Sequence, residues 1–191
     1  MTTLYISYGS NLNKRAMRMR CPGARPIGKI YLSHARLVFR GVADVEFAEN
    51  LKSVVPCGLW AITKEDEAAL DRYEGVGSGL YERWIVPATY QGKKQDALFY
   101  VMMDRSGVHP PSQHYLDTIH EGYRDFGFTK NDYKILRRSI KASWNKNPSE
   151  QTASRRKRQK ADPKHHRLAA RPNDSVHWID SELRVNEDHG S

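Results

Sequence analysis

Two short segments of this 191-residue chain contain residue types and spacings that could do chemistry. In the first, Tyr8, Gly9, Ser10, Asn11 and Leu12 follow an apolar run and precede a helix-like pattern. The start of a helix leaves backbone N–H groups without intrahelical partners, and such groups bind carboxylates. The same residues could instead form an ordinary capped turn, because strand–turn–helix junctions are common. The pattern therefore leaves an anion site and a capped turn as alternatives.

The second segment places Glu74 at the C-terminal end of a predicted helix. An ionised carboxylate there faces the negative pole of the helix dipole. If Tyr73, Val76 and Leu80 also shield this carboxylate from water, its pKa should rise towards the value that a general acid/base needs near neutral pH. The alternative is a surface acid on a frayed last turn, because glutamate is rarely buried.

Motifs for several other chemistries are absent from the sequence. It contains no phosphate-binding loop, HExxH zinc motif, GxSxG nucleophile motif or His/Cys cluster with metal-ligand spacing. The glycine-rich residues 75–80 resemble a dinucleotide loop, but they follow a helix and have Leu80 in place of the third glycine. Cys21 and Cys57 are far apart, which indicates neither a disulfide framework nor a thiolate site. We therefore expect no metal and no cofactor.

The elements that must position these residues are predicted to be a mostly antiparallel sheet and a few helices. Runs rich in β-branched and aromatic residues predict strands, and Gly92-Lys93-Lys94 predicts a hairpin turn between the last two. The predicted strands are residues 4–8, 28–39, 56–62, 82–90 and 97–103.

Helix signals surround both candidate segments. Asn11 is expected to cap a helix that ends near Arg20, and Thr63 with Asp66 forms a capping box for a helix that ends at Gly75. Residues 113–123 and 131–144 have apolar side chains at helical spacing, which predicts two further helices with core-packing faces.

The charge distribution divides the chain into a domain, residues 1–147, and a basic, disordered tail, residues 148–191. Residues 155–171 contain eight basic residues and one acid, so they carry most of the formal net charge of +9. Such a run could bind nucleic acid or another anionic partner non-specifically, act as a nuclear localisation signal or only aid solubility. The apolar residues 176–183 could fold back on the domain or bind a partner.

Hydropathy predicts no membrane span, because no window approaches roughly 18 consecutive apolar residues. The N-terminus does not have the pattern of a secretion signal. We therefore expect a cytoplasmic protein, or a nuclear one in a eukaryotic cell through the basic tail.

Together the two segments resemble the γ-glutamylcyclotransferase-like family. The resemblance rests on YGSNL at residues 8–12, LDRYEGVGSGLYERWIVPAT at residues 70–89, and YVMMDRSGVHPPSQHYLDTIHEGYRDFGF at residues 100–128. It spans about residues 4–144 and does not cover the basic tail. Residues 26–55 match only in general strand character.

The resemblance implies a small, mixed, mostly antiparallel β-barrel with flanking helices and a cavity that carries the YGSNL turn at its mouth. It implies that a γ-glutamyl small molecule is converted to 5-oxoproline and a free amine without a cofactor. By the same resemblance Glu74 is the general acid/base, the backbone of residues 8–12 holds the γ-glutamyl group, and Tyr81 and Tyr115 contact the substrate. The Asn11-Leu12 pair favours γ-glutamyl amino acids or amines over glutathione. The alternative is a binding protein of the same fold that acts through its basic tail without turnover, and the intact Glu74 argues against it.

Overall fold

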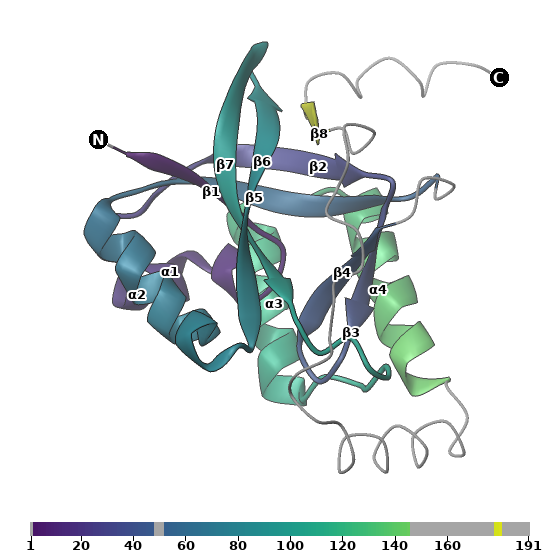
Figure 1. Cartoon of the computed structure of the whole chain (residues 1–191). Coiled ribbons are helices and arrows are strands. Elements are labelled where there is room, and N and C mark those ends of the chain that lie inside the picture. The colour runs from purple at the N-terminus through teal and green to yellow at the C-terminus, as the bar shows by residue number, and fades with distance from the viewer. Residues whose placement is uncertain (1, 48–51, 146–177, 181–191) are drawn as a thin grey trace, which may run out of the picture.

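The computed structural model of the protein describes residues 2–47, 52–145 and 178–180, which form two sheets and four α-helices (Figure 1). The larger sheet has the strand order β6-β7-β1-β5-β2-β8. The strands are β1 (Thr3–Ser7), β2 (Arg25–Ser33), β3 (Ala35–Phe39), β4 (Ala43–Phe47), β5 (Val54–Ile62), β6 (Tyr81–Tyr90), β7 (Lys93–Met102) and β8 (Trp178–Asp180). The helices are α1 (Lys14–Arg20), α2 (Lys64–Glu74), α3 (Gln113–Asp125) and α4 (Lys130–Trp144).

The larger sheet is mixed and mostly antiparallel, as the sequence predicts. Only the pairing of β1 with β7 is parallel among its described strands. The expected closed barrel is wrong for the described residues, because β6 and β8 end the strand order without pairing to each other. The predicted strand at residues 28–39 is two strands, since His34 has a φ of 53° and turns the chain out of the sheet. Beyond this turn β3 pairs with β4 as a separate sheet.

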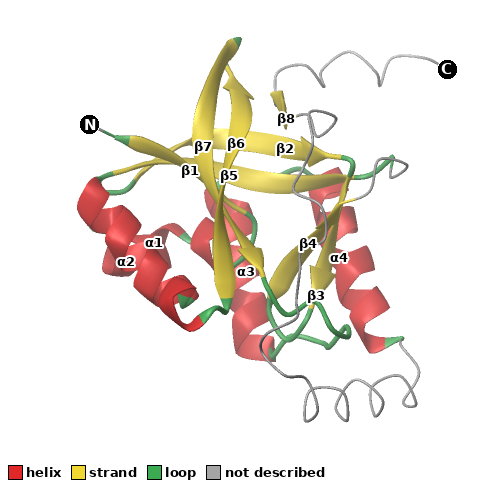
Figure 2. Cartoon of the chain, viewed as in Figure 1, coloured by secondary structure: helices red, strands yellow, loops and turns green. Residues whose placement is uncertain are grey.

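The larger sheet is covered on both faces, which gives the protein two hydrophobic cores. Ile6 of β1 packs in the core that includes Leu116 of α3 and Leu136 of α4. Its neighbour Tyr5 points the other way, into the core formed with α1 and α2, because successive side chains of a strand face opposite sides. Figure 2 shows α1 and α2 lying together, apart from α4, which packs along β3.

The helix boundaries agree with most of the capping signals. Thr63 and Asp66 form the predicted capping box of α2, and Gly75 ends this helix with a left-handed φ of 67°. The predicted cap of the first helix is wrong. Residues Ser10–Leu12 form a short 3-10 helix, η1, and the side chain of Asn13 accepts the capping hydrogen bond from the backbone of Ala16.

Most of the predicted tail lies outside the described residues, including the basic run at 155–171. Within residues 176–183, however, strand β8 pairs antiparallel with β2, with Trp178 opposite Leu32 and Asp180 opposite Ile30. Residues 178–180 therefore fold back on the domain. The boundary between residues 147 and 148 stays a prediction. None of the described helices is long and apolar enough to cross a membrane.

Candidate active site

A cavity of about 180 Å³ lies beside the turn that follows β1. Its walls come from β1, the turn, the connection between β3 and β4, the end of α2, β6, β7 and α3. The residues that line it are Tyr5, Ile6, Tyr8, Gly9, Ser10, Asn11, Val42, Ala43, Tyr73, Glu74, Tyr81, Tyr100 and Tyr115. The fold thus brings seven of the eight residues predicted from the sequence to one place, and Leu12 is the exception.

The turn is held in place by its own hydrogen bonds and by α3. The backbone N–H of Leu12 donates to the carbonyl of Gly9 at 3.0 Å, and that of Asn13 donates to Ser10 at 3.1 Å. The side chain of Leu12 is fully buried, and it lies so close to Gly122 of α3 that a Cβ there would approach its Cβ to 2.5 Å. Leu12 therefore anchors the turn instead of lining the cavity.

Glu74 is the last residue of α2, and it lines the cavity together with residues 8–11 of the turn. Its Oε1 accepts a hydrogen bond of 2.8 Å from Nδ2 of Asn11, whereas Oε2 has no hydrogen-bond donor among the described residues. Burial raises the pKa of Glu74 to about 7, although the charge of Arg20 and the hydrogen bond from Asn11 both lower it. At neutral pH this carboxyl group is therefore able both to accept and to donate a proton.

Tyrosines enclose Glu74, and two of the three residues expected to shield it are exposed. Tyr73 and Leu80 are 48% and 61% exposed. The enclosing side chains come from five different elements of the fold, and they are Tyr5, Tyr8, Tyr81, Tyr100 and Tyr115. Burial is the main cause of the raised pKa of each phenol, and the negative charge of Glu74 adds to it. The phenols therefore stay protonated at neutral pH. Tyr8 and Tyr100 already donate their hydroxyl protons, to the carbonyl of Tyr100 and to Asp71.

Asn11 connects Glu74 to two further side chains. Its Nδ2 also donates to the hydroxyl of Tyr5 at 2.9 Å, and its Oδ1 accepts from Nη1 of Arg20 at 2.6 Å. The guanidinium group of Arg20 stacks on the ring of Tyr73, 3.8 Å from the ring centre. The side chain of Asn11 therefore faces the cavity, which explains why Asn13 caps α1 in its place.

Tyr115 and Tyr8 are two further tyrosines that line the cavity. The hydroxyl of Tyr115 accepts from the backbone N–H of Ala43 at 3.0 Å, and it lies where a Cβ on Gly9 would approach to 2.9 Å. The hydroxyl of Tyr8 donates to the carbonyl of Tyr100 at 3.0 Å. Gly9 therefore allows the turn and α3 to meet closely.

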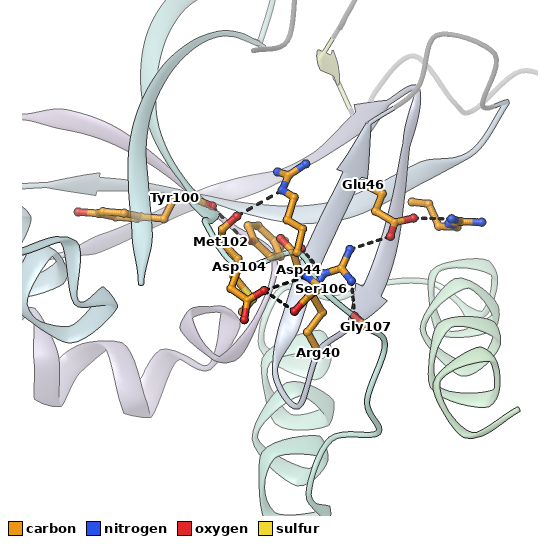
Figure 3. Close-up of polar contacts among 11 residues, drawn as sticks. Arg40, Asp44, Glu46, Tyr100, Met102, Asp104, Ser106 and Gly107 are labelled. Carbon is orange, nitrogen blue, oxygen red and sulfur yellow. Dashed lines mark hydrogen bonds and ion pairs between the residues drawn. The ribbon is translucent and has the colours of Figure 1, made fainter. Parts of the chain in front are cut away.

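Arg40 is the centre of an ion-pair cluster next to Ala43 in the chain (Figure 3). The side chain of Arg40 lies between Asp44 and Glu46, with N–O distances of 2.8 Å to each carboxylate, and it also donates to the carbonyl of Gly107. These contacts join the β3–β4 hairpin to the loop that precedes α3. They fix the part of the chain that presents the N–H of Ala43 to Tyr115.

Several residues of the site escape the sequence analysis. Val42 and Ala43 lie where the chain matches the family only in general strand character, so no signal marks them. Tyr5 and Tyr100 are strand residues whose aromatic character predicts burial but not the element that they face. Arg20 is one of several basic residues of α1, and its contacts with Asn11 and Tyr73 are what distinguish it. Among the described residues, no group of three or more His, Cys, Asp or Glu side chains is placed to hold a metal ion.

Comparisons with known proteins agree with this fold. Residues 55–133 match the model of the AIG2-like family, and this range includes Glu74, Tyr81 and Tyr115. A Bos taurus protein named γ-glutamylcyclotransferase is 29% identical over 137 residues, which cover 65% of this chain and 71% of the bovine protein.

Two solved structures have the same fold. The structure of an uncharacterised Homo sapiens protein is similar with a TM-score of 0.61 and 26% identity, over 71% of this chain and 86% of that chain. A structure named γ-glutamyl cyclotransferase has a TM-score of 0.60 and 22% identity, over 82% of this chain and 99% of that chain.

Proposed function

Because the chain belongs to the AIG2-like family of γ-glutamylcyclotransferase relatives, we propose that it releases 5-oxoproline and a free amine from a γ-glutamyl amino acid or γ-glutamyl amine. The observation that carries this proposal is the carboxyl group of Glu74, which has a pKa of about 7 in a cavity bounded by the turn at residues 8–11. Such a group can move protons near neutral pH, and its free Oε2 is available to the substrate.

The substrate supplies both reacting groups. Its α-amino nitrogen attacks its own γ-carbonyl carbon, which forms the five-membered ring of 5-oxoproline and breaks the bond to the leaving nitrogen. Because the two groups are already tethered, their effective concentration is high, and the protein need not provide a nucleophile. What the protein must do is hold the folded substrate and move protons between its two nitrogens.

Glu74 fits the proton-transfer role. As a carboxylate it accepts a proton from the substrate's α-ammonium group, which frees the lone pair for attack. As a carboxylic acid it then protonates the leaving nitrogen while the C–N bond breaks. The second proton lost by the attacking nitrogen follows the same path, so the reaction needs no water and no external acid or base.

The turn and the phenols fit the binding role. The first N–H groups of η1 have no intrahelical carbonyl partners, and that of Ser10 faces the hydroxyl of Tyr115. The turn and this hydroxyl can therefore hold either the α-carboxylate or the oxygen that becomes negative during attack. The half-buried phenols of Tyr81 and Tyr115 line the same cavity. A volume of about 180 Å³ suits one γ-glutamyl group, because sites for drug-sized ligands begin at roughly 300 Å³. The leaving amine would then extend towards the exposed rim at Tyr73.

The test is to incubate the protein with a panel of γ-glutamyl amino acids, γ-glutamyl amines and glutathione, and to measure 5-oxoproline by mass spectrometry. We expect release from at least one conjugate and a loss of more than about a hundredfold in Glu74→Gln, since general acid/base groups contribute roughly 10² to 10⁴ in rate. A Glu74→Gln variant that retains full turnover would exclude the proposed mechanism.

A further inference from the structure

We propose that Arg20 is a positioning residue: it holds the side-chain amide of Asn11 in the one orientation in which that amide donates to Glu74. The proposal rests on the proposed acid/base role of Glu74, but the arrangement that it describes is testable without turnover. Arg20 does not line the cavity, and its guanidinium group reaches Glu74 through Asn11.

The argument begins with what each side chain can donate. Arginine has only N–H donors, whereas the two ends of an asparagine amide have opposite hydrogen-bonding character. The 2.6 Å contact from Nη1 of Arg20 can therefore form only with Oδ1 of Asn11. With Oδ1 held in this way, Nδ2 must point to the other side, where it reaches Oε1 of Glu74 at 2.8 Å and the hydroxyl of Tyr5 at 2.9 Å.

Without Arg20, Asn11 has a second orientation of similar shape. A half-turn of the amide would place Oδ1 beside Glu74, where it could accept a hydrogen bond only from the protonated carboxylic acid. One orientation thus favours the carboxylate and the other favours the acid. Arg20 selects the first, and its own positive charge acts on Glu74 in the same direction.

The position of Arg20 is itself fixed. Its guanidinium group stacks on Tyr73 at 3.8 Å from the ring centre, and the hydroxyl of Tyr73 lies 3.3 Å from Oγ of Ser10 in the turn. A positive charge in the last turn of α1 also interacts favourably with the helix dipole. Arg18 lies in the same turn, provides the same interaction and is exposed. The contact with Asn11 therefore separates Arg20 from its neighbour on the same helix end.

Other groups also act on Glu74 and must be held constant in a test. The titratable and charged groups that face Glu74 or its cavity are Tyr5 from β1, Tyr8 from the turn, Arg20 from α1, Tyr73 from α2, Tyr81 from β6, Tyr100 from β7 and Tyr115 from α3. Arg20 is the cation of this group, and the rest are phenols.

The experiment measures the pKa of Glu74 by NMR titration of carboxyl-labelled glutamates, with the signal assigned from its loss in Glu74→Gln. The variants are Arg20→Met and the matched control Arg18→Met, each made with Asn11 and with Asn11→Ala. We expect Arg20→Met to raise the pKa of Glu74 by on the order of one unit, because a nearby charge and an ordered donor are both lost. Arg18→Met should leave it unchanged.

The Asn11→Ala background separates positioning from direct charge. If Arg20 acts through Asn11, the shift caused by Arg20→Met should shrink to about half or less in this background, since the two changes remove parts of one network. An equal shift in both backgrounds, or no shift in either, would overturn the proposal. The midpoint of the acid limb in the pH profile of kcat/KM should shift by the same amount as the pKa of Glu74.

A second variant covers the case in which Arg20→Met does not fold. Arg20→Ala likewise removes both the charge and the donor to Oδ1 of Asn11, so its effect on the pKa of Glu74 should also depend on Asn11. Independence from Asn11 would contradict positioning. If Glu74→Gln retains turnover, the proposed function fails, whereas the NMR titration still decides whether Arg20 orients Asn11.

Discussion

The side-chain amide of Asn11 donates a 2.8 Å hydrogen bond to Oε1 of Glu74, and so joins the turn after β1 to the end of α2 across 63 residues of sequence. Burial favours the protonated form of Glu74, whereas Asn11 and Arg20 favour its ionised form. The balance of these effects places the pKa of Glu74 at about 7. The same contact gives Glu74 a fixed position relative to the turn that is proposed to bind the γ-glutamyl group.

The first prediction concerns the pH dependence of turnover. Glu74 must be ionised to accept a proton, so kcat/KM should rise with pH through a limb centred at about pH 7. Asn11→Ala removes a donor that favours the carboxylate, and the limb should therefore move to higher pH. Initial rates between pH 5 and 9 with one conjugate measure both profiles. A wild-type limb near the ordinary carboxyl pKa of 4.5 would contradict the environment described for Glu74.

The second prediction concerns stability. Because the pKa of Glu74 is raised on folding, the folded protein binds this proton more tightly than the unfolded chain, and stability falls as pH rises from about 4.5 to about 7. Glu74→Gln removes the ionisable group but keeps an acceptor for Asn11. We expect it to be more stable than the wild type by about 1–3 kcal/mol at pH 8, after allowance for partial exposure, and by little at pH 4.5.

Urea unfolding of both proteins at the two pH values measures this difference. Glu65→Gln is the matched control on the same helix, because hydrogen bonds from its own backbone and from Thr63 hold the pKa of Glu65 below its usual value. This variant should gain no stability at pH 8. A Glu74→Gln variant with the same stability difference at both pH values would show that Glu74 is not strained in its ionised form.

The third prediction concerns the close contact between the turn and α3. A Cβ on Gly9 would lie 2.9 Å from the hydroxyl oxygen of Tyr115 and 3.3 Å from Cβ of Ala43. Gly9→Ala should therefore push Tyr115 away and lower kcat/KM by roughly tenfold to a hundredfold, since small displacements of binding groups are costly. Adding Tyr115→Phe removes the clashing oxygen and should restore part of the loss.

Steady-state kinetics of the two single variants and the double variant test this contact. Gly77→Ala is the control, because a Cβ at Gly77 meets no atom within 4 Å. It should leave kcat/KM close to the wild-type value. If the fold-decrease in kcat/KM of the double variant equals the product of the two single-variant decreases, Gly9 and Tyr115 act independently of each other.

Local signals predict the elements that carry the site well. The capping box at Thr63 and the left-handed Gly75 define α2, and thereby place Glu74 at a helix end. The runs of β-branched and aromatic residues and the hairpin signal predict β6 and β7, and these strands pair along their full length. These features depend on neighbours within a few residues along the chain, and local sequence patterns can predict features of that kind.

The parts that the sequence does not predict depend on contacts between distant segments. Asn11 has the residue type of a helix cap, but its partners Glu74 and Tyr5 draw its side chain into the cavity. The turn at His34 removes β3 from the main sheet, and a positive φ at histidine has no strong sequence signal. For the same reason the tyrosines around Glu74 could be predicted as buried but not as neighbours.

The fourth prediction concerns the ion pairs of Arg40, shown in Figure 3. The side chains of Arg40 and Asp44 are 4% and 0% exposed, so Arg40→Met would leave the charge of Asp44 buried without its main partner. We expect a loss of about 3 kcal/mol in the free energy of unfolding at pH 7, measured by urea titration.

Arg36→Met is the control, because it removes an ion pair with the same Glu46. The side chain of Arg36 is 59% exposed, so the loss of this pair should cost no more than about 1 kcal/mol. Because Arg40 also fixes the hairpin that presents the N–H of Ala43 to Tyr115, Arg40→Met should lower kcat/KM under conditions in which the variant is still folded. Equal destabilisation by the two arginine variants would mean that burial does not strengthen the Arg40 ion pairs.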